Sequence, residues 1–334
     1  MNLLETLLWP LTLPFGAATR LRARAYQKGL LRERRLPGMV ISVGNLTLGG
    51  TGKTPMVLWI AERLIARGEK TGILTRGYRG QPSDGAATSD EAQLLKARLG
   101  DQVAMGVGAD RWARGSELAT RGVRWFILDD GFQHLELARD VDLVLIDATN
   151  PFGGGHLLPA GRLREPKSAL ARADLIAITR SDYAPAVEAA IRRESNSPIF
   201  YARMHLDSVH AWRGEYPGLE DENARARRFF VFCGIGNPFA FLADLKSTGF
   251  QIVGHRFFPD HHRYNRQNAR SLEAAAEQAG ADRLLCSEKD LFNLSGIGPL
   301  SIPVDYCRSS LQVEREDEFW RAIMTHAASR PEIG

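Results

Sequence analysis

A glycine-rich loop between a buried strand and a helix constrains this chain more than any other feature. Residues 39–43 read MVISV, a short apolar run that predicts a buried strand, and residues 55–68 have a helical pattern ending at Gly68. Between them lie Thr47, Leu48, Gly49, Gly50, Thr51, Gly52, Lys53 and Thr54. Strand, glycine loop and helix in this order are the context of a phosphate-binding P-loop.

The chemistry of this loop follows from its residue types. We expect backbone N–H groups and the helix N-terminus to hold the phosphates of a nucleotide, Lys53 to reach the β- and γ-phosphates, and Thr54 to ligate Mg²⁺. The usual pattern has glycine at position 47, where this chain has Thr47, so we expect Gly49 and Gly50 to supply the flexibility. The alternative, a chance glycine-rich turn, does not explain the flanking strand and helix.

The rest of the chain indicates an α/β fold. Further apolar strands are expected at 71–75, 125–129, 141–147 and 173–179, alternating with helices. This alternation predicts a P-loop NTPase-type, mostly parallel sheet with helices on both faces. Strands at 228–233, 250–258 and 283–287, with helices between them, predict a second, smaller α/β domain. The expected divisions are an N-terminal segment at 1–37, the P-loop domain at 38–208, a polar linker at 209–227 and the smaller domain at 228–330.

Two adjacent acids end the predicted strand at 125–129. Asp129 and Asp130 stand where a Walker B carboxylate reaches Mg²⁺ at the carboxyl edge of a parallel sheet, although two such acids can also form a plain turn. Because a P-loop precedes them, we expect the metal role, together with Thr54. Arg76 and Arg79 follow the strand expected at 71–75. They are candidates for binding an anionic substrate or phosphate, and the alternative is that they belong to a solvated loop. The loop at 153–166 is a candidate lid or substrate loop.

Two further segments carry candidate acid–base groups. Ser89, Asp90 and Glu91 precede a helix, so Asp90 is either part of ordinary helix-capping chemistry or a general base. Residues 257–264 read FFPDHHRY, where a histidine oriented by a carboxylate can assist a base. The alternative is a capped turn that opens the next helix.

The N-terminus combines an apolar face with a basic segment. Leucines recur at helical spacing in residues 1–16, which also contain Pro10 and Pro14 and are too short to span a bilayer. Residues 20–35 contain seven Lys/Arg and one acid, so this segment has a charge of +6. Because the whole chain has a net charge of +4, the remaining residues sum to −2. This pattern predicts a helix lying in the surface of an anionic membrane rather than a nucleic-acid-binding protein. A terminal helix packed on the protein's own core is the alternative.

Taken together, the motifs resemble the tetraacyldisaccharide 4'-kinase family. The segments that carry the resemblance, in order, are VGNLTLGGTGKTP, RGYRG, SDEAQLL, LDDGFQH, LLPAGRLREP, FPDHHRY and SEKD, between about residues 40 and 290. The resemblance implies transfer of the ATP γ-phosphate to the 4'-hydroxyl of an acylated glucosamine disaccharide 1-phosphate, giving lipid IVA. It also implies Mg²⁺ and peripheral attachment to the cytoplasmic face of the inner membrane. From the local charge distribution we expect no nucleic-acid partner, and we expect a monomer.

The resemblance also assigns residues. Asp90 corresponds to the proposed base and His261 to its partner, with His261 preferred over His262 because it follows Asp260. Gln133 and Glu165 match residues that line the site, and Arg76 is a candidate substrate contact. The family pattern has a proline where this chain has Ala92. A membrane-recruited P-loop ATPase switch and a P-loop ligase acting on a soluble carboxylate are the competing functions.

Overall fold

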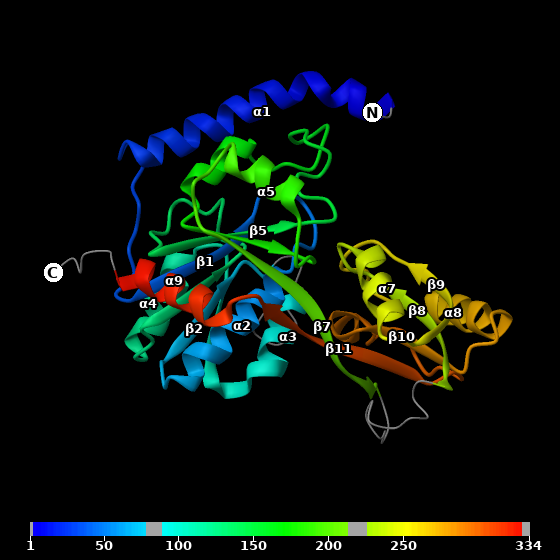
Figure 1. The fold of residues 1–334 in the computed structure, drawn as a ribbon. Coiled ribbons are helices and arrows are strands. Elements are labelled where there is room, and N and C mark those ends of the chain that lie inside the picture. Colours follow the sequence, from blue (N-terminus) through cyan, green and yellow to red (C-terminus); the bar gives the residue numbers. More distant parts are fainter. Residues whose placement is uncertain (1–2, 78–88, 213–225, 329–334) are drawn as a thin grey trace. The chain divides into compact units, whose positions relative to one another are not determined.

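The structure, a computed structural model, describes residues 3–77, 89–212 and 226–328 (Figure 1). The chain forms two compact units. Among the described residues, the first unit comprises 3–77, 98–203 and 312–328, and the second comprises 89–97, 204–212 and 226–311.

The first unit is built on a parallel sheet. Its strands lie in the order β3 (Val103–Val107), β2 (Thr71–Thr75), β4 (Trp125–Asp129), β1 (Met39–Asn45), β5 (Val141–Asp147), β6 (Leu175–Thr179) and β7 (Ile199–Ala211). The strands from β3 to β7 pair in parallel. The helices of this unit are α1 (Leu3–Gln27), α2 (Lys53–Ala66), α4 (Arg111–Thr120), α5 (Pro185–Arg192) and α9 (Glu316–Ala328), with short 3₁₀ turns η1 (Gly100–Gln102) and η2 (Lys167–Arg172).

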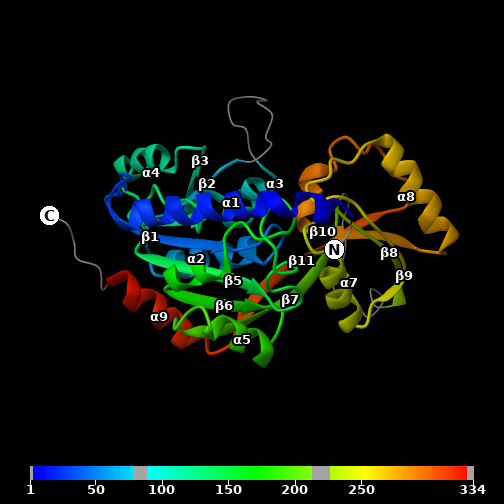
Figure 2. The same ribbon diagram turned by 90° about the horizontal axis from the view of Figure 1, so that it is seen from above.

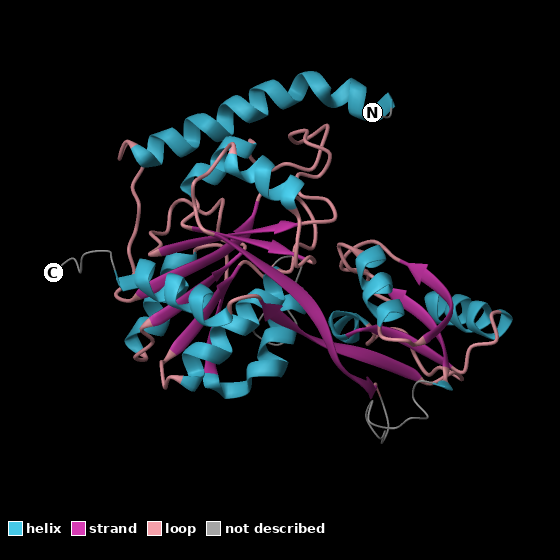
Figure 3. Cartoon of the chain, in the orientation of Figure 1, coloured by secondary structure: helices cyan, strands magenta, loops and turns pink. Residues whose placement is uncertain are grey.

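Burial explains the apolar runs in this sheet. Strands β2, β4 and β5 are buried along their whole length, as expected of central strands covered on both faces. Ile191 of α5 closes one hydrophobic cluster over β5 and β6, and Leu118 of α4 closes another over β4. Helices flank the strands in the cartoon of Figure 3. The predicted α/β fold, with a mostly parallel sheet covered by helices, is confirmed.

The N-terminal helix is longer than the apolar run that predicted it. Helix α1 continues through Pro10 and Pro14 into the basic segment and lies along the outside of the first unit (Figure 2). Gly16 faces the loop at 153–166, because a Cβ added there would lie 2.7 Å from Cδ1 of Leu157. Leu7, Leu11, Leu13 and Leu21 are nevertheless more than half exposed. Within the described residues, no helix combines the length and the apolar character needed to cross a bilayer.

The second unit is a smaller α/β assembly. Strands β7, β11 (Val304–Val313), β10 (Arg283–Ser287), β8 (Arg228–Cys233) and β9 (Gln251–Phe257) follow one another in the sheet, and β11 to β9 pair in parallel. The unit also contains α3 (Asp90–Leu99) up to residue 97, α7 (Pro238–Ser247), α8 (Arg266–Gln278) and the 3₁₀ turn η3 (Glu288–Asn293). Phe232, Leu272, Leu284 and Cys286 are fully buried in its main core.

These units differ from the divisions expected at residues 208 and 330. The two long strands β7 and β11 each pass from one unit into the other, so residues 312–328 join the first unit. The first residues of the expected linker, 209–211, end β7, and 213–225 lie outside the described residues. Strands β3, β7 and β11 and helices α4, α5 and α9 were not predicted. Strand β3 is only partly buried and β7 alternates between exposed and partly buried residues in its second half, so neither gives a continuous apolar run.

Candidate active site

The P-loop follows β1 and leads directly into α2. Gly52 occupies the N-cap of α2 with φ 88°, and Gly49 has φ 125°, so both adopt backbone conformations that disfavour other residues. Gly50 has no positive φ, so only Gly49 of the expected pair supplies left-handed geometry. Glycine at the N-cap also has no side chain that competes for the first-turn N–H groups of α2. The loop therefore has the form that binds phosphate at a helix N-terminus.

The structure explains why threonine is tolerated at position 47. Thr47 is buried and forms an isolated antiparallel bridge with Leu163. Its carbonyl accepts a hydrogen bond from Nδ2 of Asn45 at 2.9 Å, and the next residue, Leu48, donates its N–H to the carbonyl of Arg162 at 2.8 Å. Position 47 thus takes part in an extended pairing with the loop at 153–166, where no left-handed residue is needed.

Lys53 and Asp130 come together at the carboxyl edge of the sheet. Val43 of β1 is in register with Asp129 of β4, so the acids lie beside the strand that leads into the P-loop. Nζ of Lys53 is 3.5 Å from Oδ1 of Asp130 and donates to Oδ1 of Asn45 at 3.2 Å. Asp129 is buried and accepts a 3.4 Å hydrogen bond from Oγ1 of Thr75.

Arg164 is a member of this group that sequence reasoning did not assign. Its guanidinium donates to both carboxylate oxygens of Asp130 at 2.8 Å and to the carbonyl and side chain of Asn45. Burial opposes ionisation of Asp130, but the positive charges of Lys53 and Arg164 outweigh it and lower the pKa of Asp130. Asp130 also has a positive φ of 52°, uncommon outside glycine. Arg164 lies in the LLPAGRLREP segment, and the glycine- and arginine-rich sequence of this segment is the feature that made the loop a candidate.

Gln133 and Glu165 contact each other next to the same strand end. Nε2 of Gln133 donates to Oε1 of Glu165 at 3.0 Å and to the carbonyl of Asn45 at 3.1 Å. Glu165 is 5% exposed and forms an ion pair with Arg172, with 2.9 Å between NH1 and Oε2. Gln133 also accepts at its carbonyl a 3.0 Å hydrogen bond from Arg22 of α1. These two residues therefore form a partly buried polar network beside Asn45.

A positively charged environment surrounds the neighbouring His134. Burial, followed by the charges of Arg111, Arg139 and Arg22, lowers the pKa of His134 to about 4. Its side chain is therefore neutral near pH 7. Arg76 is exposed after β2, close enough to Arg111 for their charges to interact, while Arg79 lies outside the described residues. This arrangement favours an anionic ligand.

Asp90 and His261 are in direct contact in the second unit. Nδ1 of His261 lies 2.9 Å from both Oδ1 and Oδ2 of Asp90. Nδ2 of Asn293 donates to Oδ2 of Asp90 at 3.2 Å, and Nζ of Lys289 lies 3.8 Å from the same oxygen. Ser89 caps α3 by accepting the N–H of Ala92 at 3.2 Å, which leaves the Asp90 carboxylate available to His261.

The two charges in this pair stabilise each other. Burial raises the pKa of Asp90. The hydrogen bond from His261 and the charge of Lys289 lower it by more than burial raises it, so the pKa of Asp90 is below its usual value. For His261 the hydrogen bond to Asp90 dominates and raises the pKa, against burial and Lys289. Asp90 therefore stays ionised and His261 gains proton affinity.

His261 and His262 have different surroundings. His261 has φ 61°, and its N–H donates to the carbonyl of Gly234 at 3.0 Å and to Asp260 at 3.1 Å. His262 instead stacks on Phe258, with ring centroids 4.6 Å apart, and its Nε2 lies 3.1 Å from Oδ1 of Asn268. The contact with Asp90 thus belongs to His261. The cap of α8 is Asn265, so the turn is not simply a helix start.

Metal ligands were predicted at Thr54, Asp129 and Asp130. Within 3–77, 89–212 and 226–328, no group of three or more His, Cys, Asp or Glu side chains is arranged to hold a metal ion. The predicted set has two carboxylates and one hydroxyl. Such an all-oxygen set is the kind that Mg²⁺ prefers when nucleotide phosphates complete its coordination.

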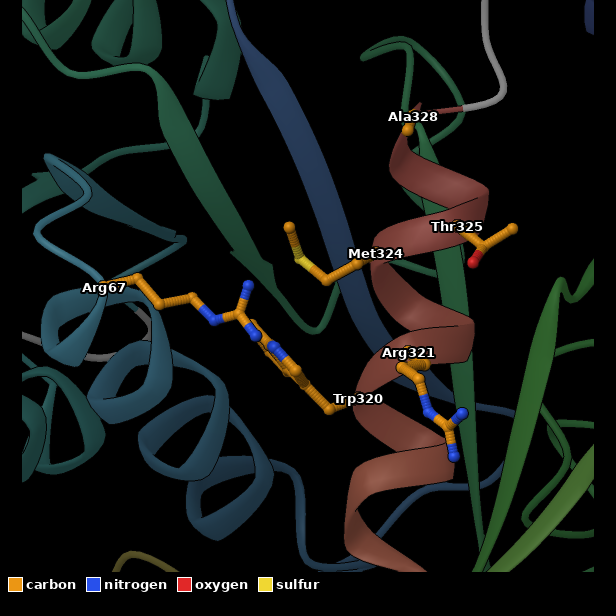
Figure 4. A pocket seen from close by; sticks show the side chains of 6 residues that line it. All are labelled: Arg67, Trp320, Arg321, Met324, Thr325 and Ala328. Atoms are coloured by element: carbon orange, nitrogen blue, oxygen red, sulfur yellow. The ribbon is translucent and has the colours of Figure 1, made fainter.

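A cavity of about 540 Å³ lies elsewhere in the first unit. Its lining residues are Arg67, Trp320, Arg321, Met324, Thr325 and Ala328 (Figure 4). The guanidinium of Arg67 lies 5.1 Å from the ring centroid of Trp320. Arg67 follows the end of α2, whereas the P-loop precedes its start, so the helix length of about 20 Å separates them. None of the residues lining this cavity is a predicted site residue.

The P-loop between β1 and α2 and the parallel sheet around it define a P-loop NTPase-type α/β protein. The model of the family described as tetraacyldisaccharide-1-P 4'-kinase matches residues 4–328. This chain belongs to that family. A tetraacyldisaccharide 4'-kinase of Geobacter metallireducens is 41% identical over 316 residues, covering 89% of this chain and 90% of the relative. One of Anaeromyxobacter sp. strain Fw109-5 is 39% identical, covering 84% and 80%.

A solved structure has the same fold. The crystal structure of LpxK from Aquifex aeolicus, determined in complex with ATP, has a TM-score of 0.74 and 28% identity, and the match covers 97% of this chain and 99% of that one. The predicted family and the predicted kinase activity are confirmed. The roles of individual site residues remain predictions.

Proposed function

We propose that this kinase transfers the γ-phosphoryl group of ATP to the 4'-hydroxyl of a tetraacylated glucosamine disaccharide 1-phosphate, forming lipid IVA. The relatives that support this substrate are named for it and cover most of the chain. The observation that carries the proposal is the hydrogen bond between His261 and Asp90, because a sugar hydroxyl needs a proton acceptor and an ATP-binding loop alone does not provide one.

The reaction assigns a task to each group. The 4'-oxygen forms a bond to the γ-phosphorus while the bond to the bridging β–γ oxygen breaks, ADP leaves, and the hydroxyl proton passes to Asp90. His261 orients that carboxylate through Nδ1 and stabilises it once the proton has moved. Lys53 and the N–H groups of the P-loop hold the transferring phosphates and offset the charge on them.

Mg²⁺ is part of the proposal. Thr54, Asp129 and Asp130 are the residues that would hold it, because their oxygens suit this ion. When bound beside the phosphates, the ion neutralises charge on the transferring group. The present pairing of Asp130 with Arg164 and Lys53 keeps that carboxylate ionised, as a ligand must be.

We also propose that α1 attaches the protein to the anionic cytoplasmic face of the inner membrane. The exposed leucines of α1 and the basic residues that follow them support this role. An acylated substrate remains in the bilayer, so an enzyme that acts on it gains from lying at the same surface.

One incubation tests the central proposal. The protein is mixed with Mg²⁺, [γ-³²P]ATP and the tetraacyl disaccharide 1-phosphate in detergent micelles, and products are separated by thin-layer chromatography. We expect label in a lipid product whose formation needs the 4'-hydroxyl, and none with an acceptor already substituted there. Label found only as inorganic phosphate would instead indicate an ATPase and overturn the proposal.

A further inference from the structure

Lys289 lies among three carboxylates beside the Asp90–His261 pair. Its Nζ is 3.3 Å from Oδ1 of Asp260, 3.4 Å from Oε1 of Glu91 and 3.8 Å from Oδ2 of Asp90. These acids come from two segments: the first turn of α3 and the turn after β9. Lys289 itself belongs to η3, so one ammonium group joins three segments of the second unit.

The charges around the pair are unbalanced without this lysine. Asp90, Glu91 and Asp260 carry three negative charges, and Nε2 of His261 is 3.7 Å from Asp260. Asn293 contributes a neutral amide to Asp90. The Lys289 side chain is 18% exposed, so water screens these interactions only partly.

We propose that Lys289 is a positioning residue for phosphoryl transfer, which holds Asp90 ionised and offsets the negative charge that Glu91 and Asp260 impose on His261. This inference rests on the proposed function. Lys289 also ties the first turn of α3 to the turn that carries His261, so it fixes the distance between base and partner. It acts through Asp90 and His261, which it contacts or faces, and not as the proton acceptor.

Removing the charge of Lys289 should change the pH dependence of kcat. The direction of this change is the same whether Asp90 or His261 is the group that titrates. Loss of a nearby positive charge favours the protonated form of Asp90 and equally the protonated form of His261. Both pKa values therefore rise. If activity needs either group deprotonated, the acid limb of the kcat profile moves to higher pH.

The test compares Lys289→Met and Lys289→Gln, which remove the charge, with Lys289→Arg, which keeps it. Transfer to the tetraacyl disaccharide 1-phosphate is measured from pH 5 to 9, with kcat and KM determined separately for ATP. We expect both neutral variants to move the acid limb upward by about one to three pH units, the range for one charge at about 4 Å between full water screening and the weaker screening near a protein surface, with an unchanged KM for ATP. Lys289→Arg should restore the wild-type limb, and Lys246→Met on α7, which removes an exposed lysine, should leave it unmoved.

A second readout needs no catalysis. The pKa of His261 is followed by NMR of its ring protons in the full-length protein, and the neutral variants should raise it. The inference would be overturned if the neutral variants fold but show the wild-type acid limb of the kcat profile and the wild-type pKa of His261. Failure of the wild-type protein to phosphorylate the acceptor would overturn the proposed function, while the NMR titration would still judge the role of Lys289.

Discussion

Nδ1 of His261 lies 2.9 Å from both carboxylate oxygens of Asp90, a residue 171 positions earlier in the chain. The Asp90 side chain is 5% exposed and that of His261 is 28% exposed, so the pair is sheltered on one side and reachable on the other. A buried carboxylate with an accessible imidazole partner is suited to accept a proton from a bound ligand.

Removing the carboxylate charge should abolish most of the catalysis. We expect Asp90→Asn to lower kcat by about 10²–10⁴-fold, the usual contribution of a general base. ATP affinity should stay unchanged, because the P-loop belongs to the other unit. Steady-state transfer assays and a nucleotide-binding titration measure the two quantities. Turnover within a few-fold of the wild type would remove Asp90 from the mechanism.

The Asp90–His261 pair should also appear in the pH dependence of stability. The raised pKa of His261 stabilises the fold below its ordinary value of about 6.5 and this contribution is lost as pH rises through the folded-state value. The lowered pKa of Asp90 contributes above its ordinary value and is lost on acidification through the folded-state value. Urea unfolding should therefore show the largest stability difference between wild type and Asp90→Asn between the two ordinary values. A difference independent of pH would contradict this coupling.

Lys53 should be required for transfer. Lys53→Ala removes the ammonium group that lies against Asp130 at the start of α2, so we expect transfer to fall by at least about 10²-fold. Lys70→Ala, an exposed lysine just before β2, is the matched control and should behave as wild type. An active Lys53→Ala protein in the same radiolabel assay would discredit the P-loop assignment.

Asp290 should be a structural residue of the second unit. Its side chain is 1% exposed and accepts hydrogen bonds from the N–H of Gly234, the hydroxyl of Tyr264 and the N–H and hydroxyl of Ser287. Asp290→Ala leaves these buried donors without their acceptor, so we expect a loss of about 3 kcal/mol or more in unfolding free energy. Urea denaturation measures it. Asp282→Ala, which removes an exposed ion pair with Arg228, should change the free energy of unfolding little. Equal losses of unfolding free energy in the two variants would show that Asp290 has no special role.

Membrane attachment should depend on the exposed leucines of α1. Leu7→Ser combined with Leu11→Ser removes apolar surface while leaving the contact of Arg22 with Gln133 intact. We expect a clear loss of sedimentation with vesicles containing anionic lipid and no loss of fold. Tyr183→Ser changes an exposed aromatic residue that is not part of α1 and serves as the control. Undiminished binding by the leucine variant would argue against α1 as the anchor.

The sequence predicted the local elements well where hydrophobic patterns are strong. The run at 39–43, the helix after Lys53 and the strands at 71–75 and 125–129 all lie within buried elements, because central strands of a parallel sheet need continuous apolar residues. Strand β7 was not predicted because its second half has no continuous run of buried apolar residues. Arg164 and Lys289 stood inside quoted motifs but had no assigned partner, since arginine and lysine are usual on any surface.

The sequence by itself determined that this chain has a P-loop between strand and helix, acids at a strand end and a set of motifs typical of one kinase family. These are local patterns, and local spacing is enough to read them. Only the tertiary structure decided that Asp90 meets His261 rather than His262, that Lys289 lies among three acids, and that Arg164 joins Asp130. Such contacts join segments far apart in the chain, and the packing of strands and turns, not their spacing along the sequence, sets those distances.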